Sequence, residues 1–165
     1  MNDKKTLLII ILFTIIIFVG AVFVLSSGST SSNVKASEFA KAYTVDPTSF
    51  DWGNIPYEGE KATKNFTIKN EGSDTLKLFN VRTSCHCTIA RVSINRIESQ
   101  NFGMSGISSW VGEVPAGKEA KLIVIFDQTY HGPQGIGPIT RFVSLETNDK
   151  ATPELTFTLT GNVVK

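Results

Sequence analysis

Short runs of β-branched and aromatic residues fill the chain from Ser49 onward, and turn residues separate them about every ten positions. Within residues 62–70, Phe66 and Ile68 fall on one side of an extended chain and their polar neighbours on the other, which is typical of a half-buried strand. The strands predicted in this way lie around Phe50 and Trp52 and at residues 62–70, 75–83, 121–126, 139–147 and 155–164. Such spacing predicts an all-β sandwich or barrel.

Two of these runs depart from simple alternation. In residues 75–83 the two leucines share one parity while Phe79 and Val81 share the other, which predicts a β-bulge or a change of sheet. Residues 121–126 are almost continuously apolar, which predicts a central strand buried on both faces. No segment after residue 44 has the period of a helix, so the predicted class is all-β.

A different pattern occupies the N-terminus, where residues 6–25 are mostly apolar and carry no charge. About 20 such residues are needed for a helix to cross a bilayer, and a signal peptide usually has an apolar region of only about 7–15 residues. We therefore expect a single transmembrane helix as an uncleaved anchor, with a removed signal peptide as the alternative. Lys4 and Lys5 place residues 1–5 in the cytoplasm by the positive-inside rule. The expected location is the cell membrane, crossed once, with the C-terminal domain extracytoplasmic.

Between this anchor and the predicted strands, residues 26–32 have the serine-rich composition of a flexible tether. The periodicity stays poor as far as Pro47. The expected organisation is therefore a cytoplasmic tail at residues 1–5, a transmembrane anchor at 6–25, a flexible linker at 26–47 and a β-sandwich domain at 48–165.

Composition narrows the classes of function. The chain of 165 residues has a formal net charge of +1, and no cluster of Lys and Arg follows the N-terminus, which argues against binding of nucleic acid. The sequence contains no glycine-rich phosphate loop and no serine nucleophile elbow. A catalytic pair of Cys85 and His131 would lack the rest of its site. We therefore expect no catalysis.

Both cysteines stand in the short segment Cys85-His86-Cys87. In an extended strand the two sulfurs face one side and His86 faces the other. Three interpretations stay open: a structural role as buried residues or a local disulfide, a tight and easily reduced disulfide between Cys85 and Cys87, or binding of copper or zinc by the two thiolates.

A metal site that includes Cys85, His86 and Cys87 together requires the segment to form a turn. Further ligands would come from His131 or Met104. A Cys-x-Cys pair is weaker evidence for metal than paired Cys-x-x-Cys motifs, and an extracytoplasmic location favours oxidation of the thiols.

Residues 93–112 form a long segment rich in Ser, Gly and Asn that also carries large apolar side chains. Segments of this length are usually functional or form a local insertion with its own apolar contact. One interpretation is an insertion that Phe102 and Trp110 pin to the edge of the sandwich. The other is a partner-binding loop that uses Phe102, Met104, Ile107 and Trp110.

Several motifs together resemble the bacterial family called domain of unknown function 1573. In chain order they are Phe50-Asp51-Trp52-Gly53, Gly59-Glu60, Lys69-Asn70-Glu71-Gly72, Ser84 to Thr88, Pro115-Ala116-Gly117, Phe126-Asp127, Thr147-Asn148-Asp149 and Gly161-Asn162-Val163. They span roughly residues 49–164. The chain differs from the family pattern at His86, where the family has glycine, and in the greater length of residues 93–112.

This resemblance implies an immunoglobulin-like β-sandwich, related to domains of the major-sperm-protein and Hydin type, outside the cytoplasm. It implies no reaction. The expected function is a membrane-anchored, extracytoplasmic binding or scaffolding domain, with the membrane and another extracytoplasmic protein as its partners. The expected contact surface combines residues 93–112 with the loops at 84–88 and 128–138. The alternative is handling of a soft metal, copper or zinc, or redox chemistry through Cys85 and Cys87.

Overall fold

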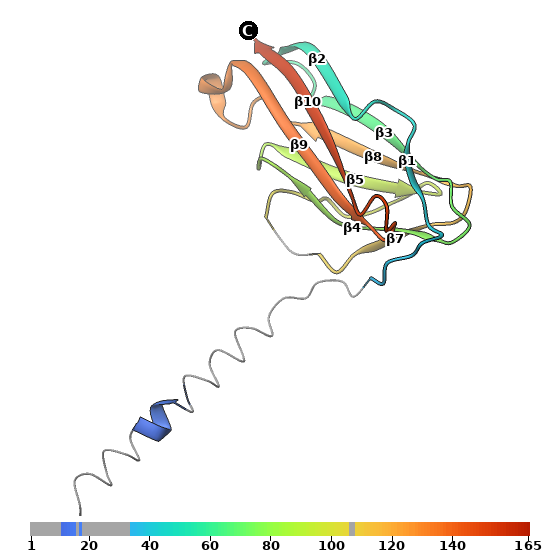
Figure 1. The fold of residues 1–165 in the computed structure, drawn as a ribbon. Coiled ribbons are helices and arrows are strands. Elements are labelled where there is room, and N and C mark those ends of the chain that lie inside the picture. Colours follow the sequence, from blue (N-terminus) through green and yellow to red (C-terminus); the bar gives the residue numbers. More distant parts are fainter. Residues whose placement is uncertain (1–10, 16, 18–33, 106–107) are drawn as a thin grey trace, which may run out of the picture. The chain divides into compact units, whose positions relative to one another are not determined.

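The computed structural model describes residues 11–15, 17, 34–105 and 108–165. Residues 11–15 and 17 are helical, and the rest of the transmembrane helix expected at residues 6–25 lies outside the described residues. Among the residues that the structure describes, no helix has the length and apolar content needed to span a bilayer. The chain divides into two units, residues 1–31 and 32–165, and the second is the β domain (Figure 1).

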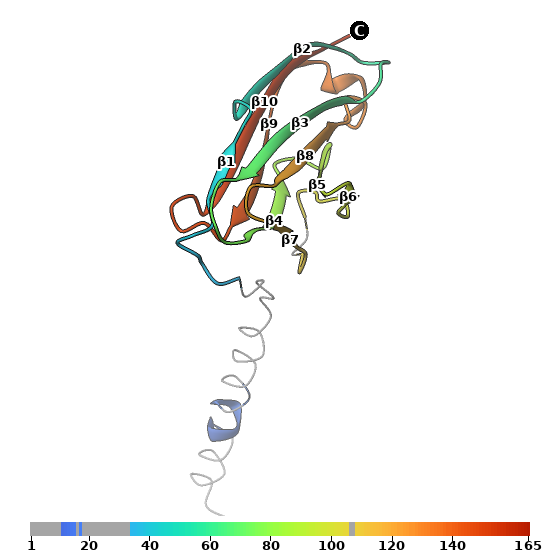
Figure 2. The same cartoon turned by 90° about the vertical axis from the view of Figure 1, so that its right-hand side faces the viewer.

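Two five-stranded sheets form the β domain (Figure 1, Figure 2). The first sheet contains, in spatial order, β1 (Ala42–Thr44), β3 (Ala62–Asn70), β8 (Glu119–Phe126), β5 (Thr88–Ile94) and β6 (Ile97–Glu98). The second contains β2 (Ser49–Pro56), β10 (Glu154–Val164), β9 (Gly137–Thr147), β4 (Leu76–Thr83) and β7 (Val111–Val114). Strands β2 and β10 run parallel, and a short 3₁₀-helix, η1 (Gly132–Gly135), precedes β9.

The inner faces of the two sheets meet in an apolar core. Phe66 of β3 packs against Phe157 of β10 with ring centroids 4.5 Å apart, and both rings are fully buried. The alternation that predicts strand β3 also sets which of its side chains face inward, because Phe66 and Ile68 are buried and Asn65 is exposed. The all-β prediction is confirmed, and a strand occupies each of the predicted segments.

Strand β4 contains the irregularity that its change of parity predicts. Its pairing with β9 shifts register between Phe79 and Arg82, and Asn80 adopts a φ of 49°, in the left-handed region. Because of this bulge, Leu78 and Val81 both join the core although they do not share one parity, while Phe79 is buried outside that core cluster.

Strand β8 is central, but the prediction that it is buried on both faces is wrong. It lies between β3 and β5, and its inward side chains Leu122 and Val124 are fully buried. Ile123 and Ile125, on the outer face, are only half-buried. A two-layer sandwich leaves the outer face of each sheet partly open to solvent, so even a central strand has one covered face.

The N-terminal boundary of the β domain also differs from the expected one. Residues 37–47, which belong to the expected flexible linker at 26–47, are part of the β domain: β1 pairs with β3, Ser37 forms a bridge with Asp149, and Ala40 is completely buried. This segment is held by individual hydrogen bonds more than by an apolar face, which explains its poor periodicity. Residues 26–33 lie outside the described residues.

The buried side chain of Asn70 joins four chain segments at the end of β3. Its amide nitrogen donates to the carbonyl oxygens of Asp74 and Val114 at 2.8 and 2.9 Å. Its amide oxygen accepts from the backbone N–H groups of Gly72 at 3.0 Å and Lys41 at 3.4 Å. The first strand, the β3–β4 turn and the end of β7 are therefore fixed through one amide.

Gly72 has a steric reason to be glycine. A Cβ atom at this position would collide with the backbone of Phe39 and Lys41, which crosses directly over it. The motif Lys69-Asn70-Glu71-Gly72 is therefore explained by packing of the N-terminal segment onto the β3–β4 turn.

The motif Thr147-Asn148-Asp149 plays the same part at the end of β9. Asn148 accepts from the N–H of Lys77 at 2.7 Å and donates to the carbonyl of Thr75 at 3.0 Å. The carboxylate of Asp149 accepts from the N–H groups of Ala42 and Ala151, both at 2.9 Å. Both side chains are buried and hydrogen-bonded, so these polar residues close this end of the sandwich.

We expect Asn70→Ala to lower the free energy of unfolding by about 2–3 kcal/mol, because it leaves buried backbone N–H and C=O groups without a hydrogen-bond partner. Asn65→Ala on the same strand is the matched control, since Asn65 is exposed and its loss should change stability by less than about 0.5 kcal/mol. Urea denaturation of both variants measures the difference. Equal stability of the two variants would contradict the role assigned to the Asn70 amide.

A second prediction concerns pH. The hydrogen bond from Ser37, the bond from the Thr75 backbone and the charge of Lys77 hold the pKa of Asp74 below its usual value of 3.8. Because the folded-state pKa is depressed, the stabilisation is present above about pH 4 and disappears as the pH falls through the folded-state value. Asp74→Asn should therefore lose stability relative to the wild type at pH 7, and this difference should vanish in acid.

The Ser37→Ala background provides the control for this pH effect. Ser37 supplies the largest contribution to the lowered pKa, so Asp74→Asn should change the pH dependence less in that background. Chemical denaturation between pH 2.5 and 7 measures the stability of the wild type, the two single variants and the double variant. An undiminished effect in the Ser37→Ala background would rule out this hydrogen bond as the main cause.

Candidate functional site

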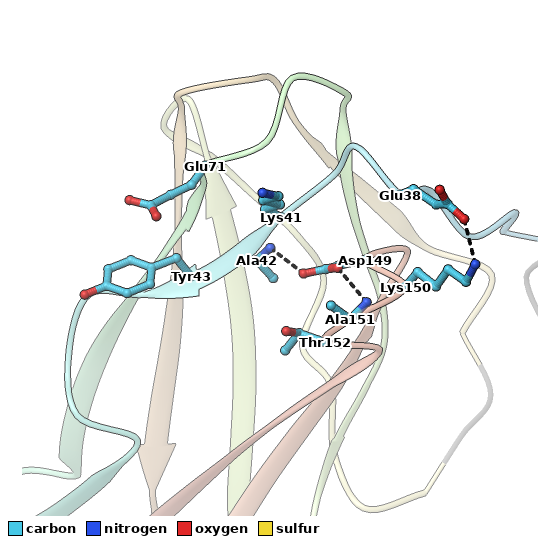
Figure 3. A pocket seen from close by; sticks show the side chains of 9 residues that line it. All are labelled: Glu38, Lys41, Ala42, Tyr43, Glu71, Asp149, Lys150, Ala151 and Thr152. Carbon is cyan, nitrogen blue, oxygen red and sulfur yellow. Dashed lines mark hydrogen bonds and ion pairs between the residues drawn. The ribbon is translucent and has the colours of Figure 1, made fainter.

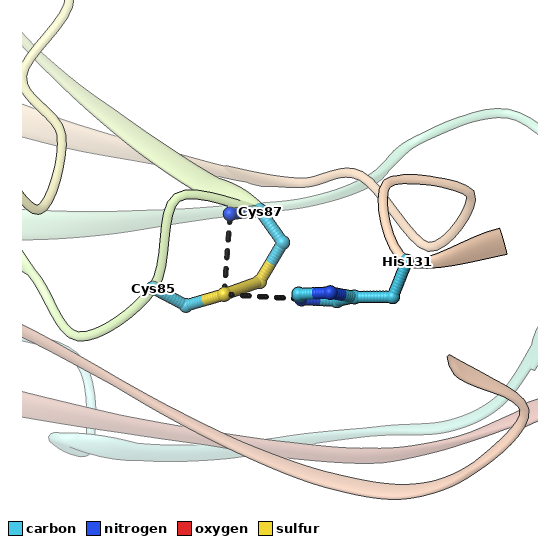
Figure 4. A group of neighbouring side chains, drawn as sticks. All are labelled: Cys85, Cys87 and His131. Atoms are coloured by element: carbon cyan, nitrogen blue, oxygen red, sulfur yellow. Dashed lines mark hydrogen bonds between the residues drawn. A yellow bond between two sulfur atoms is a disulfide. The ribbon is translucent and has the colours of Figure 1, made fainter. Parts of the chain in front are cut away.

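Cys85 and Cys87 lie in a tight turn between β4 and β5 and are joined by a disulfide (Figure 4). The segment is therefore not extended, and the Cα atoms of the two cysteines are 5.2 Å apart. The N–H of Thr88 donates to the carbonyl of Cys85 at 3.1 Å, and the N–H of Cys87 lies 3.1 Å from the Cys85 sulfur. Cys87 is buried and Cys85 is half-buried, so one sulfur of the pair is near solvent.

The two histidines take different places from the ones expected for a Cys-His-Cys site. His86 is exposed at the tip of the turn and does not join the cluster. His131 does join it, with Nε2 3.5 Å from the Cys85 sulfur (Figure 4). Among the described residues, Cys85, Cys87 and His131 are the group of His, Cys and acidic side chains whose ligand atoms lie close enough to hold a metal ion, within 4.8 Å of one another.

The positively charged side chain of Arg141 contacts the other sulfur of the disulfide. The Nε–H of Arg141, on β9, donates to the Cys87 sulfur at 3.1 Å. The guanidinium also lies over the ring of Phe126, 5.2 Å from its centroid, and Phe126 stacks on Trp52 with centroids 5.9 Å apart. Burial lowers the pKa of Arg141, but an arginine stays protonated at neutral pH. The cysteine pair thus lies between a histidine and an arginine that is stacked on the ring of Phe126.

The loop that carries His131 is anchored at its base. Gln128 is buried, and its amide nitrogen donates to the carbonyls of Pro56, Gly59 and Glu60 at 2.9–3.3 Å. Asp127 accepts from the N–H and hydroxyl of Thr129 and pairs with Lys61 at 2.7 Å. The bond to Lys61, followed by those to Thr129, lowers the pKa of Asp127. These contacts fix the start of the loop beside the β2–β3 turn.

The predicted partner-binding residues at 93–112 are spread over different environments. Phe102 is only 4% exposed, pairs with Ala90 of β5 and lies 5.2 Å from the ring of Trp110, which is half-buried. These two residues pin the segment to the sandwich and offer little contact area. Met104 is 51% exposed, and Ile107 lies outside the described residues.

The structure brings the three expected contact loops together only in part. The N–H of Thr83 donates to the carbonyl of Gly103 at 3.3 Å, which places residues 103–104 beside the cysteine turn. The Cys85–His131 contact adds the loop after β8. We call the surface formed by residues 84–88, 103–104 and 127–136 the cysteine end. Strands β6 and β7 pair elsewhere, with residues 93–94 of β5 and residues 76–79 of β4.

A shallow hollow at the opposite end is a weaker candidate for a site. Its lining includes Asp149, Glu38 and Lys150 (Figure 3). Asp149 is already bonded to backbone N–H groups, and Glu38 pairs with Lys150 at 2.6 Å. These three groups already have partners, so they are poorly suited to selecting a ligand.

The chemistry available at the cysteine end is that of a dithiol and its disulfide. Two sulfurs, one imidazole and one guanidinium suit thiol exchange or the binding of a soft cation. Arg141 is the member of this group that the sequence analysis does not include. Its only signal is that it is a charged residue in a predicted strand. The pairing of β9 with β4 in the same sheet is what places it near Cys87.

One family model matches part of the chain. The model of the family described as "Protein of unknown function (DUF1573)" matches residues 43–104. No curated protein matches the chain.

Solved structures of similar fold come from varied sources. A protein of unknown function from Porphyromonas gingivalis W83 is 19% identical with a TM-score of 0.56; the match covers 81% of this chain and 51% of that protein, so the chain spans about half of its length. An ASH/PapD-like domain (domain 7) of human CEP192 is 16% identical, with a TM-score of 0.47 over 84% of this chain and 95% of that one. WR4, a C. elegans MSP family member, is 15% identical, with a TM-score of 0.38 over 78% and 100%.

The family match begins inside β1 and ends at Met104, so it includes the Lys-Asn-Glu-Gly motif and the cysteine turn. The Porphyromonas gingivalis protein supports the two-sheet fold over most of this chain. Residues 43–104 match the DUF1573 family model, in agreement with the resemblance that the motifs in this part of the chain carry; the motifs at residues 115–163 lie outside the matched range.

Proposed function

We propose that this protein is an extracytoplasmic binding domain, held at a membrane by residues 6–25, that binds another protein through its cysteine end. The observation that carries this proposal is the convergence of separate loops on one end of a rigid sandwich. The end loops of immunoglobulin-like sandwiches commonly serve as contact surfaces.

The side chains at this end have the character of a contact surface. Met104 and Tyr130 are 51% and 55% exposed, and Phe142, whose backbone bonds to Ser84 at both N–H and carbonyl, is 48% exposed. Large exposed aromatic and sulfur-containing side chains supply much of the binding energy in protein interfaces. These three side chains are candidates for contact with an apolar face of a partner.

The loops beneath these side chains are held in place before any partner binds. The disulfide fixes the cysteine turn, and Gln128 fixes the base of the loop that carries Tyr130. Preorganised loops lose less conformational entropy on association, which favours binding. Residues 37–42 join the opposite end of the β domain, where Lys41 bonds to Asn70 and Ala42 bonds to Asp149.

Site-specific photo-crosslinking in intact membranes tests this proposal. A photoreactive residue in place of Tyr130 should give a discrete adduct with one protein. Tyr43 is the matched control, because it is a tyrosine of similar exposure, 51%, on β1 at the other end of the domain. Position 43 should give no such adduct, and Phe142→Ala should reduce the yield from position 130 at least threefold. Equal adducts from both positions would contradict a binding surface at the cysteine end.

Membrane attachment is tested separately. The full chain should resist extraction with alkaline carbonate, and the Ile15→Arg variant should be released, since an arginine at the centre of a spanning helix costs about 2.5–3.5 kcal/mol in insertion. Ser31→Arg, beyond the apolar run, should leave attachment unchanged. Release of the unaltered chain by carbonate would contradict the anchor.

A further inference from the structure

We propose that the reduced form of the domain binds one Cu(I) ion through the sulfurs of Cys85 and Cys87 and the Nε2 atom of His131. This site is independent of the proposed partner binding, because it rests on the donor atoms and charges around the disulfide alone. His86, which stands between the cysteines in the sequence, has no part in it.

The positions of the donors suit one ion. The ligand atoms of the three side chains lie within 4.8 Å of one another, from two loops that meet at the cysteine end. Two thiolates on one metal at about 2.3 Å each, in a trigonal arrangement, are separated by about 4 Å. The Cα atoms, 5.2 Å apart, allow this separation by rotation of the side chains alone once the disulfide opens.

The number and type of donors favour Cu(I) over zinc. Thiolates are soft ligands that select Cu(I), and structural zinc sites almost always use four ligands. Among the described residues the cluster contains three donors, two of them sulfur. A three-donor set of this kind matches the low coordination number of Cu(I).

The charge around the site points the same way. Two thiolates and a monovalent cation carry a net charge of −1, and the guanidinium of Arg141, 3.1 Å from the Cys87 sulfur, balances it. A divalent cation would make the cluster neutral and leave the arginine without an opposite charge. Arg141 is a positioning residue here, since it contacts a ligand atom and not the metal.

Formation of the site requires reduction of the disulfide, and the step balances with a dithiol as reductant. The dithiol gives two electrons and two protons to the Cys85–Cys87 bond, becomes a disulfide itself, and leaves two thiols. Each thiol then releases its proton to solvent as its sulfur binds Cu(I). Oxidation of the cysteines removes both sulfur ligands, so metal binding follows the redox state.

Copper competition on the full-length chain in a non-ionic detergent tests the proposal. The chain is reduced anaerobically with a water-soluble phosphine, which is then removed, and titrated into the Cu(I) complex of bicinchoninate, whose absorbance reports the copper that the chelator still holds. The reduced chain should withdraw one equivalent of Cu(I), and the oxidised chain should withdraw none. X-ray absorption of the loaded protein should show two sulfur ligands and one nitrogen ligand.

The two histidines provide a matched pair of variants. His131→Ala should weaken Cu(I) binding at least tenfold, and His86→Ala should leave it unchanged, although both side chains are exposed and neither loss should unfold the domain. Arg141→Gln should lower the ratio of Cu(I) to zinc affinity. Absence of copper uptake by the reduced chain, equal uptake by the oxidised chain, or wild-type affinity in His131→Ala would each overturn the three-donor assignment.

Discussion

The amide of Asn70 is the interaction on which one whole end of the sandwich depends. A strand ladder satisfies backbone groups along its length but not where strands stop and turn, and buried groups at that point need other partners. Asn70 supplies two acceptor bonds and two donor bonds at the end of β3, and through Lys41 and Gly72 it fixes the N-terminal segment over the β3–β4 turn. Asn148 and Asp149 extend the same arrangement to the end of β9.

The two ends of the domain are consequently built from different chemistry. One is closed by the buried side chains of Asn70, Asn148 and Asp149, which hydrogen-bond to backbone groups and so have little left to offer a ligand. The other is held by a disulfide, by the Gln128 amide and by Arg141 over Phe126, and it keeps a half-buried sulfur and an exposed imidazole near solvent. Reactive groups are thus concentrated at the end opposite the one that residues 37–42 join.

The sequence predicts the strands that alternate clearly, because alternation reflects a local property, the inward or outward direction of successive side chains. It does not predict β1, because hydrogen bonds to Asp149 and pairing with β3 hold this strand in place. It also does not predict β5, whose short pattern directly follows the cysteine turn. At the site, the sequence includes a disulfide between Cys85 and Cys87 among its open interpretations, because the two cysteines are close in the chain. The approach of His131 and Arg141 depends on contacts 46 and 54 residues apart in the chain, which no local pattern encodes.

A disulfide between residues two positions apart contributes little to the stability of a domain of this size. In the chain-entropy model it closes a loop of three residues, which gives roughly half of the about 3 kcal/mol expected for a loop of 15 residues. The sandwich is held together elsewhere, by the Asn70 amide and by Phe66 against Phe157, which belong to a different apolar cluster from the cysteines. Reduction should therefore change the chemistry of the cysteine end while the rest of the domain stays folded. That separation between fold and thiol state is the condition that a redox-dependent metal site requires.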